Sequence, residues 1–259
     1  MQAETYYFGQ GRLLSRPAGT AGRGGWRWWG DVSALTWAPT SETVRHRESY
    51  SGQKGTVRKF NFLNECPING TLHQLDAVNL ATLLNGTVTT IAGGSVAGES
   101  LGSVAVGDLF RLDHPGVSAL VITDSAGTPT TVYSQAAPNA NFDVDPRFGA
   151  LECLALPTPA PTMPLLAAYT YAAAKQVAFL NAVPPTLALR YEGINLAEGG
   201  APVVVEWYRV SSSLLQQWAL ITSGTDVAGT EFSLEALLDS SKSPAGALGQ
   251  FGRFVALEG

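Results

Sequence analysis

The sequence has few of the side chains on which catalysis and metal binding usually depend. Its 259 residues include two cysteines, Cys66 and Cys153, and three histidines, His46, His73 and His114. The cysteines form no C-x-x-C motif, and no histidine has a second ligand at the spacing of a zinc site. We therefore expect no metal ion and no cofactor. We also expect both thiols to be buried as small hydrophobic groups, in a protein made in a reducing compartment.

Long apolar runs and a basic leader are also missing. No apolar run approaches the roughly 20 residues that a helix needs to cross a bilayer, so we expect no membrane insertion. The first eight residues lack both the basic region and the apolar region of a secretory signal, and no signal peptide is expected.

One catalytic pattern occurs, G-x-S-x-G at residues 98–102, which would make Ser100 a nucleophile. That chemistry needs a strand-to-helix turn at the serine, followed along the chain by an acid and a histidine on separate loops. Here only His114 follows, and Asp108 and Asp113 lie too close to it in sequence. We expect Ser100 to lie in an ordinary loop and the protein not to be an enzyme. A hydrolase that uses Ser100 is one alternative.

What the sequence does contain favours β-structure. Hydrophobic residues make up 45%, enough for a core, and 28 glycines and 15 prolines punctuate stretches rich in valine and threonine. Charge is unevenly placed. Residues 1–60 carry nine Lys/Arg and four Asp/Glu, a balance of +5, whereas residues 61–259 carry seven and seventeen, a balance of −10. The opposite charges of the two segments favour head-to-tail association of copies. The alternative is that the basic segment folds back on its own domain.

A long polar hairpin is the most distinctive stretch. Residues 41–50 and 56–62 alternate with period two around the glycine-punctuated loop 51–55. Neither strand has a face as apolar as that of an ordinary sandwich strand. An isolated two-stranded ribbon is marginally stable, and its open edges can pair with another chain. The partner is therefore expected to be another subunit, and the alternative is a mobile surface hairpin.

Residues 1–29 are interpreted as an N-terminal interaction arm. Tyr7, Trp26, Trp28 and Trp29 flank a Gly/Arg-rich segment that cannot bury them by itself, so their rings must dock on a neighbour or on the same molecule. Aromatic and basic residues together also occur in proteins that bind single-stranded nucleic acid, but the acidic balance and the lack of a binding motif argue against this.

The rest of the chain is predicted as a single β domain over residues 30–259. Asp76 is expected to cap a short helix whose Leu80, Leu83 and Leu84 share one face, with Gly86 after its end. Residues 92–98 are expected to form a loop or turn, and the prolines of residues 157–164 a stiff connector. Strands are predicted at residues 31–39, 71–76, 109–113, 119–123, 130–133, 165–171, 177–180, 186–192, 203–210 and 251–257.

The order of these features resembles that of the major tail tube proteins of long-tailed phages with non-contractile tails. The motifs are, in chain order, the aromatic arm, Gly30-Asp-Val32 with Leu35, Glu48-Ser-Tyr-Ser-Gly52 at the hairpin end, Leu75-Asp76 leading into residues 79–86, residues 191–195, residues 203–210 and the closing strand. Together they cover about half of the sequence. Residues 87–160 have no counterpart, so they are expected to be an insertion or a divergent part.

The resemblance implies a β-sandwich or barrel-like tail tube fold, with a flanking helix and an N-terminal arm. It implies hexameric rings that stack into a virion channel for double-stranded DNA, assembled in the bacterial cytoplasm. The expected partners are other copies of the chain, the tape measure protein, and the tail-terminator and baseplate proteins. The basic residues are expected at subunit contacts and not along the bore, because each neutralised phosphate would hold the DNA. The interface candidates are Tyr7, Trp26, Trp28, Trp29, Arg45, Arg47, Tyr50, Lys54, Arg58 and Lys59.

A second alternative is a receptor- or carbohydrate-binding β module of a phage tail or of a secreted protein. In that case exposed Trp28, Trp29 and Trp218 would stack on sugar rings. Self-assembly into rings or tubes distinguishes the two functions.

Overall fold

A computed structural model describes residues 6–19, 25–63, 65–223 and 227–257, and the chain divides into two compact units. The first unit is Met1–Val88 with Val177–Gly259, and the second is Thr89–Gln176. Residues 30–259, predicted as a single domain in which residues 87–160 are an insertion or a divergent part, are divided between these two units. All but the first two residues of the stretch 87–160, which has no counterpart, lie in the second unit, and this unit interrupts the first in sequence.

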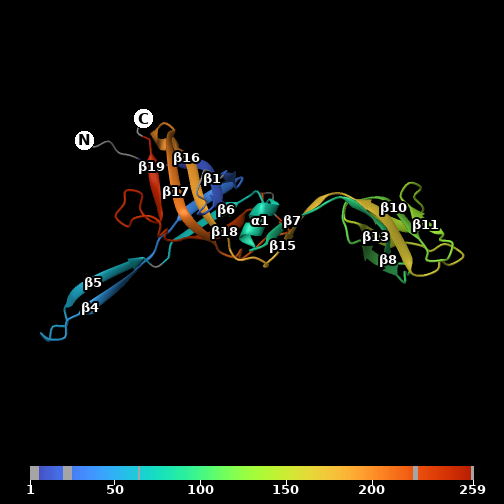
Figure 1. Cartoon of the computed structure of the whole chain (residues 1–259), viewed down its shortest axis with the longest axis horizontal. Helices are drawn as coiled ribbons and strands as arrows, with labels where there is room; N and C mark the ends of the chain where they lie inside the picture. Colours follow the sequence, from blue (N-terminus) through green and yellow to red (C-terminus); the bar gives the residue numbers. More distant parts are fainter. Residues whose placement is uncertain (1–5, 20–24, 64, 224–226, 258–259) are drawn as a thin grey trace. The chain divides into compact units, whose positions relative to one another are not determined.

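The first unit is built on an eight-stranded sheet with the order β2-β1-β16-β17-β18-β6-β3, in which β19 also pairs with β17 (Figure 1). The neighbours in this sheet are antiparallel. The strands are β1 Gly9–Pro17, β2 Arg27–Trp28, β3 Val32–Trp37, β6 Pro67–Leu72, β16 Thr186–Asn195, β17 Ala201–Ser212, β18 Thr230–Ala236 and β19 Gly252–Ala256. A 3-10 turn, η1 Leu196–Glu198, connects β16 to β17. The mainly β fold predicted from the sequence is confirmed.

Two further pairs of strands stand outside this sheet. β4 Ser41–Arg47 pairs with β5 Thr56–Leu63, as the hairpin prediction required. β7 Thr87–Ile91 pairs with β15 Ala174–Ala178, where the chain leaves the first unit and returns to it.

The second unit has two small sheets around a core of its own. Their orders are β11-β10-β14-β8 and β12-β13-β9. The strands are β8 Gly94–Gly102, β9 Leu109–Arg111, β10 Val117–Thr123, β11 Thr131–Ser134, β12 Phe142–Asp145, β13 Ala150–Cys153 and β14 Leu165–Tyr171. The buried residues of this core include Leu120, Ile122, Leu151 and Leu165.

The predicted loop at residues 92–98 is wrong, because most of it belongs to β8. Gly94 lies opposite Tyr171 in the ladder between β8 and β14. A Cβ atom at Gly94 would come within 2.8 Å of the Tyr171 hydroxyl oxygen. The glycine thus makes room for an aromatic ring across two strands, which is a recognised use of glycine within a strand.

The predicted helix is confirmed as α1, Ala77–Leu83. The Asp76 carboxylate accepts a hydrogen bond from the Asn79 backbone N–H at 2.7 Å, which caps the helix. Leu83 is fully buried in the core of the first unit, and Leu80 and Leu84 are partly buried. This short helix therefore packs its apolar side chains on the sheet. Among the described residues no helix is long and apolar enough to cross a membrane.

Much of the predicted N-terminal arm belongs to the sheet. All nine residues of β1 pair with β16, so β1 lies between β2 and β16. Trp29 is 1% exposed, lies 5.3 Å from the Phe232 ring between centroids, and donates from Nε1 to the Ser15 hydroxyl at 2.7 Å. Residues 1–5 and 20–24 lie outside the described residues. The described part of this segment therefore docks on its own molecule: β1 is hydrogen-bonded to β16, and the Trp29 ring is buried in the core.

Both cysteines are free and buried, as expected. Burial raises the pKa of both thiols, and a nearby carboxylate raises it further, Glu235 for Cys66 and Asp108 for Cys153. Each thiol therefore stays neutral and packs as a small apolar group.

The burial of Trp29 predicts a large effect of its removal. Trp29→Ala is expected to lower the free energy of unfolding by about 3–5 kcal/mol, since it empties a core site and leaves Ser15 without its donor. Trp28→Ala is the matched control, because the Trp28 side chain is half exposed, and it should cost about 1 kcal/mol or less. Chemical unfolding followed by circular dichroism measures both. Equal effects would contradict the assignment of Trp29 to the core.

Candidate assembly interface

The hairpin of β4 and β5 differs from the other described strands because each of those has at least one residue that is partly or fully buried. All seven residues of β4 and all eight of β5 are exposed. Within the described part of the chain the two strands pair only with each other, which leaves both outer edges without strand partners (Figure 1). A free-standing ribbon of this length in a protein with two well-formed cores is the leading candidate for a binding surface.

The register of the hairpin gathers apolar side chains on one face. Directly opposite residues of an antiparallel pair lie on the same side, and Val44 is opposite Phe60 while Glu42 is opposite Phe62. The rings of Phe60 and Phe62 stack with centroids 6.4 Å apart. The exposed fraction is 47% for Val44, 43% for Phe60 and 56% for Phe62. The sequence alone did not show this face, because it did not give the register.

The other face is cationic. Arg45 lies directly opposite Lys59, a pairing of like charges that weakens an isolated hairpin. Beside them, the Thr43 hydroxyl donates to the Asn61 side-chain oxygen at 3.0 Å. No ion pair is formed by Arg45 or Lys59 with any described residue. An acidic partner surface would relieve their mutual repulsion.

The tip of the hairpin is organised by Glu48. Its carboxylate accepts hydrogen bonds from the backbone N–H of Ser51, at 3.2 Å, and from the Ser51 hydroxyl. Its own backbone N–H donates to the Gly55 carbonyl at 2.9 Å. These bonds close the turn and bury Glu48, while Tyr50 stays 85% exposed. A hydrophobic ring held in solvent at the end of the ribbon is typical of a contact residue.

The base of the hairpin continues the ladder between β3 and β6. The Ala38 N–H donates to the Pro67 carbonyl at 3.1 Å, and the Thr40 N–H donates to the Glu65 carbonyl at 2.8 Å. The Glu65 N–H donates in turn to the Thr40 hydroxyl at 3.2 Å. The hairpin is therefore the outer part of a two-stranded ribbon whose inner part belongs to the sheet.

The structure separates the interface candidates into two groups. The first group lies on the hairpin and consists of Arg45, Arg47, Tyr50, Lys54, Arg58 and Lys59. All of these are exposed. Sequence reasoning missed Val44, Phe60 and Phe62, although the two phenylalanines alternate visibly along the returning strand.

The second group lies at the β2–β1 end of the sheet, whereas the hairpin continues from β3 at the other end of the strand order. Tyr7 is 60% exposed and Trp28 is 51% exposed. Trp26 is partly buried under the Arg16 guanidinium, 4.7 Å from its ring centroid. Trp29 is removed from the interface candidates, because it fills the core.

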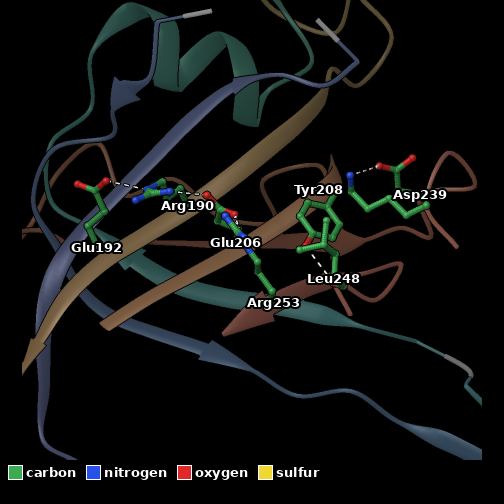
Figure 2. A network of polar contacts seen from close by, with 8 residues as sticks. Arg190, Glu192, Glu206, Tyr208, Asp239, Leu248 and Arg253 are labelled. Atoms are coloured by element: carbon green, nitrogen blue, oxygen red, sulfur yellow. Dashed lines mark hydrogen bonds and ion pairs between the residues drawn. The ribbon is translucent and has the colours of Figure 1, made fainter. Parts of the chain in front are cut away.

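A dense polar cluster is the ion network on one face of the sheet, across β16, β17 and β19 (Figure 2). Glu206 sits between two guanidinium groups, Arg190 and Arg253, and Arg253 Nε lies 2.6 Å from its carboxylate. Arg190 also donates to Glu192 at 2.7 Å. The network ties three neighbouring strands together at their side chains.

This network is unsuited to general base catalysis. Burial raises the pKa of Glu206, but the hydrogen bonds and charges of Arg253 and Arg190 outweigh it, and the pKa is lowered. A carboxylate with a lowered pKa and both oxygens engaged is a weak proton acceptor. The loop expected at Ser100 is wrong, because Ser100 lies within β8, and it does not lie at a strand-to-helix turn. No group of three side chains able to hold a metal ion occurs among the described residues.

Removal of Glu206 should therefore affect stability. Glu206→Gln is expected to lower the free energy of unfolding by about 1–3 kcal/mol at pH 7, because two guanidinium groups lose their acceptor. The folded-state pKa is below the ordinary value of 4.5, so this contribution is full above pH 4.5 and is lost as the pH falls through the folded-state pKa. The difference between the two proteins in urea unfolding should thus shrink at acidic pH.

The matched control for that measurement is Glu192→Gln. Its carboxylate is more exposed than that of Glu206, so its replacement should have the smaller effect. A difference between wild type and Glu206→Gln that did not change from pH 7 to pH 3 would contradict the structural role of the network.

Two comparisons with known proteins bear on the identity of the chain. A search of curated proteins found nothing similar. The model of a family described as protein of unknown function UCP028589 matches residues 6–255, which include both units. Since this match covers far more than half of the sequence, the chain belongs to the family of proteins of unknown function UCP028589.

Proposed function

We propose that this protein is a structural subunit that assembles with copies of itself, and that the hairpin is the element through which it does so. The observation that carries the proposal is the hairpin of fifteen strand residues, all exposed, with both edges unpaired in the described structure. Its apolar face and its like-charged face are both unfavourable in water and favourable against a partner. The function is thus architectural, not enzymatic.

The contact is expected to be heterologous. The hairpin continues from β3, while the exposed aromatic residues Tyr7 and Trp28 lie at the other end of the strand order. A surface that meets a different surface on the next copy generates closed rings or open filaments. The opposed charge of residues 1–60 and residues 61–259 also favours such an arrangement.

The assembly that fits best is the tail tube of a long-tailed phage with a non-contractile tail. The supporting features are the hairpin, the helix capped by Asp76, and the long strands β16 and β17, which contain residues 191–195 and 203–210, all within the first unit. In this proposal hexameric rings stack into a virion channel that delivers double-stranded DNA. The tube forms in the bacterial cytoplasm around the tape measure protein, with terminator and baseplate proteins at its ends.

A sugar-binding module is less well supported by the positions of the tryptophans. Trp29 is in the core, and Trp218 packs edge-on against Phe179 with centroids 6.3 Å apart. Of the three tryptophans considered for stacking on sugars, Trp28 alone is exposed. We therefore treat dispersed monomers or trimers, which such a module would give, as the outcome that contradicts the proposed assembly.

Excision of the hairpin tests the proposal directly. Wild-type protein at high concentration is expected to form rings or tubes in negative-stain electron micrographs. A variant in which a short glycine-rich turn joins Thr40 to Glu65 should remain folded and monomeric, because these residues are already hydrogen-bonded and the core does not include the hairpin. Circular dichroism and light scattering measure fold and size.

The matched control replaces only the tip. A variant with residues 50–54 changed to glycine and serine keeps both strands, so it should assemble more weakly than wild type and more strongly than the excised protein. Tubes of wild-type length from the excised variant would show that the hairpin is not the assembly element.

The channel should not retain DNA. Because the protein is acidic overall, assembled protein at physiological salt is expected to leave a short double-stranded DNA in the supernatant on co-sedimentation. Retention that was lost on Arg45→Gln with Lys59→Gln would place these cations along the bore, contrary to the expectation that they lie at subunit contacts.

A further inference from the structure

A groove lies on the outer side of the sheet, beside the strand from which the hairpin continues. It is lined by small and polar residues of β3, β6 and β18 together with Phe232, and residues 214–217 complete the lining. Its volume is about 460 Å³. The floor residues are Ala34, Thr36, Asn69, Thr71, Glu231 and Ser233. They alternate along their strands with core residues such as Phe232, so they point away from the core.

Glu231 is the one carboxylate among the residues that line this groove. It is exposed, and within the described structure it forms no ion pair and no side-chain hydrogen bond. Its cross-strand neighbour is Thr71, which offers no charge. The groove thus combines a floor of small side chains, onto which another strand pair can be laid, with one uncompensated negative charge.

We propose that the cationic face of the hairpin of one copy docks in this groove on a second copy, with Arg45 and Lys59 on either side of Glu231. The inference rests on the proposed self-assembly and names its receiving surface. Arg45 and Lys59 repel each other across the hairpin, and a carboxylate between them converts that repulsion into two attractive contacts. Thr43 and Asn61, on the same face, can hydrogen-bond the polar floor.

The hydrogen bonds at the base of the hairpin argue against docking within one copy. Ala38 and Thr40 continue the ladder of β3 onto residues 65 and 67, so the hairpin starts in line with the strand that lines the groove. To fold back over its own β3, the hairpin would have to break these bonds. A second copy meets the groove without that cost.

The position of the groove beside β3 also explains how the contact could repeat from one copy to the next. β3 lines the receiving groove through Ala34 and Thr36, and the same strand leads into the donating hairpin. Each copy therefore receives a hairpin next to the base of the one that it donates. A donor and an acceptor at different sites on one chain make a heterologous contact, which repeats until a ring closes or a filament forms.

Zero-length cross-linking of assembled wild-type protein tests the contact. A water-soluble carbodiimide joins the Lys59 amine to the Glu231 carboxylate as an amide only when the two groups touch. With an equal mixture of ¹⁴N- and ¹⁵N-labelled protein, peptide mass spectrometry is expected to find this cross-link, with mixed-isotope peptides as abundant as those of a single isotope. Peptides of a single isotope only would place the contact within one copy and overturn the inference.

Two variants serve as matched controls. Lys59→Arg keeps the charge but removes the amine, so assembly should persist while the cross-link disappears. Glu231→Gln should remove the cross-link and weaken assembly. A cross-link from Lys59 to a different carboxylate in all tubes would overturn the assignment of the groove.

Charge reversal gives an independent readout. Arg45→Glu with Lys59→Glu should abolish sedimenting polymer, and so should Glu231→Lys, because each brings like charges together. The protein carrying all three changes should polymerise again, and failure of this rescue would count against the pairing. If wild-type protein forms tubes but neither the cross-link nor the rescue appears, the docking site is wrong. If wild-type protein forms no assembly, the proposed function itself fails.

Discussion

One constraint shapes the first unit: the pairing of β3 with β6 continues beyond the other strands of the sheet as the hairpin of β4 and β5. The side chains of this hairpin are not buried against the rest of the molecule. Backbone hydrogen bonds at Thr40 and Glu65 carry the pairing outward into β4 and β5. The strands gain hydrogen bonds from each other but no buried face. Such a ribbon is poorly stabilised alone, and a partner would supply what it lacks.

The core of the first unit fixes the strands from which the hairpin continues. β6 lies between β3 and β18, and its inward side chains Ile68 and Leu72 are fully buried. Trp29 packs on the same core and bonds to Ser15. The ion network of Glu206 links the side chains of β16, β17 and β19 in the same sheet. The contacts that hold β6 are thus apolar and internal, whereas Arg45 and Lys59 on the hairpin and Glu231 in the groove form no ion pair with any described residue.

The sequence predicted features whose cause is local. Asp76 caps its helix through a residue three positions later, and the hairpin follows from alternation around a glycine-rich loop. The prediction missed β18, although buried and exposed residues alternate along it, and with β18 it missed Glu231. It mistook the glycines of β8 for a loop, because the reason for Gly94 is a tyrosine 77 positions away in the chain.

By itself, the sequence determined the mainly β class, the hairpin, the capped helix and the burial of both thiols, because these follow from periodicity, turn residues and side-chain polarity. The tertiary structure decided which aromatic residues are available. It buried Trp29, left Trp28 exposed and placed Val44 beside Phe60, because burial and register depend on partners distant in sequence. It also divided the chain into two units, each around a core assembled from strands that are far apart in the chain.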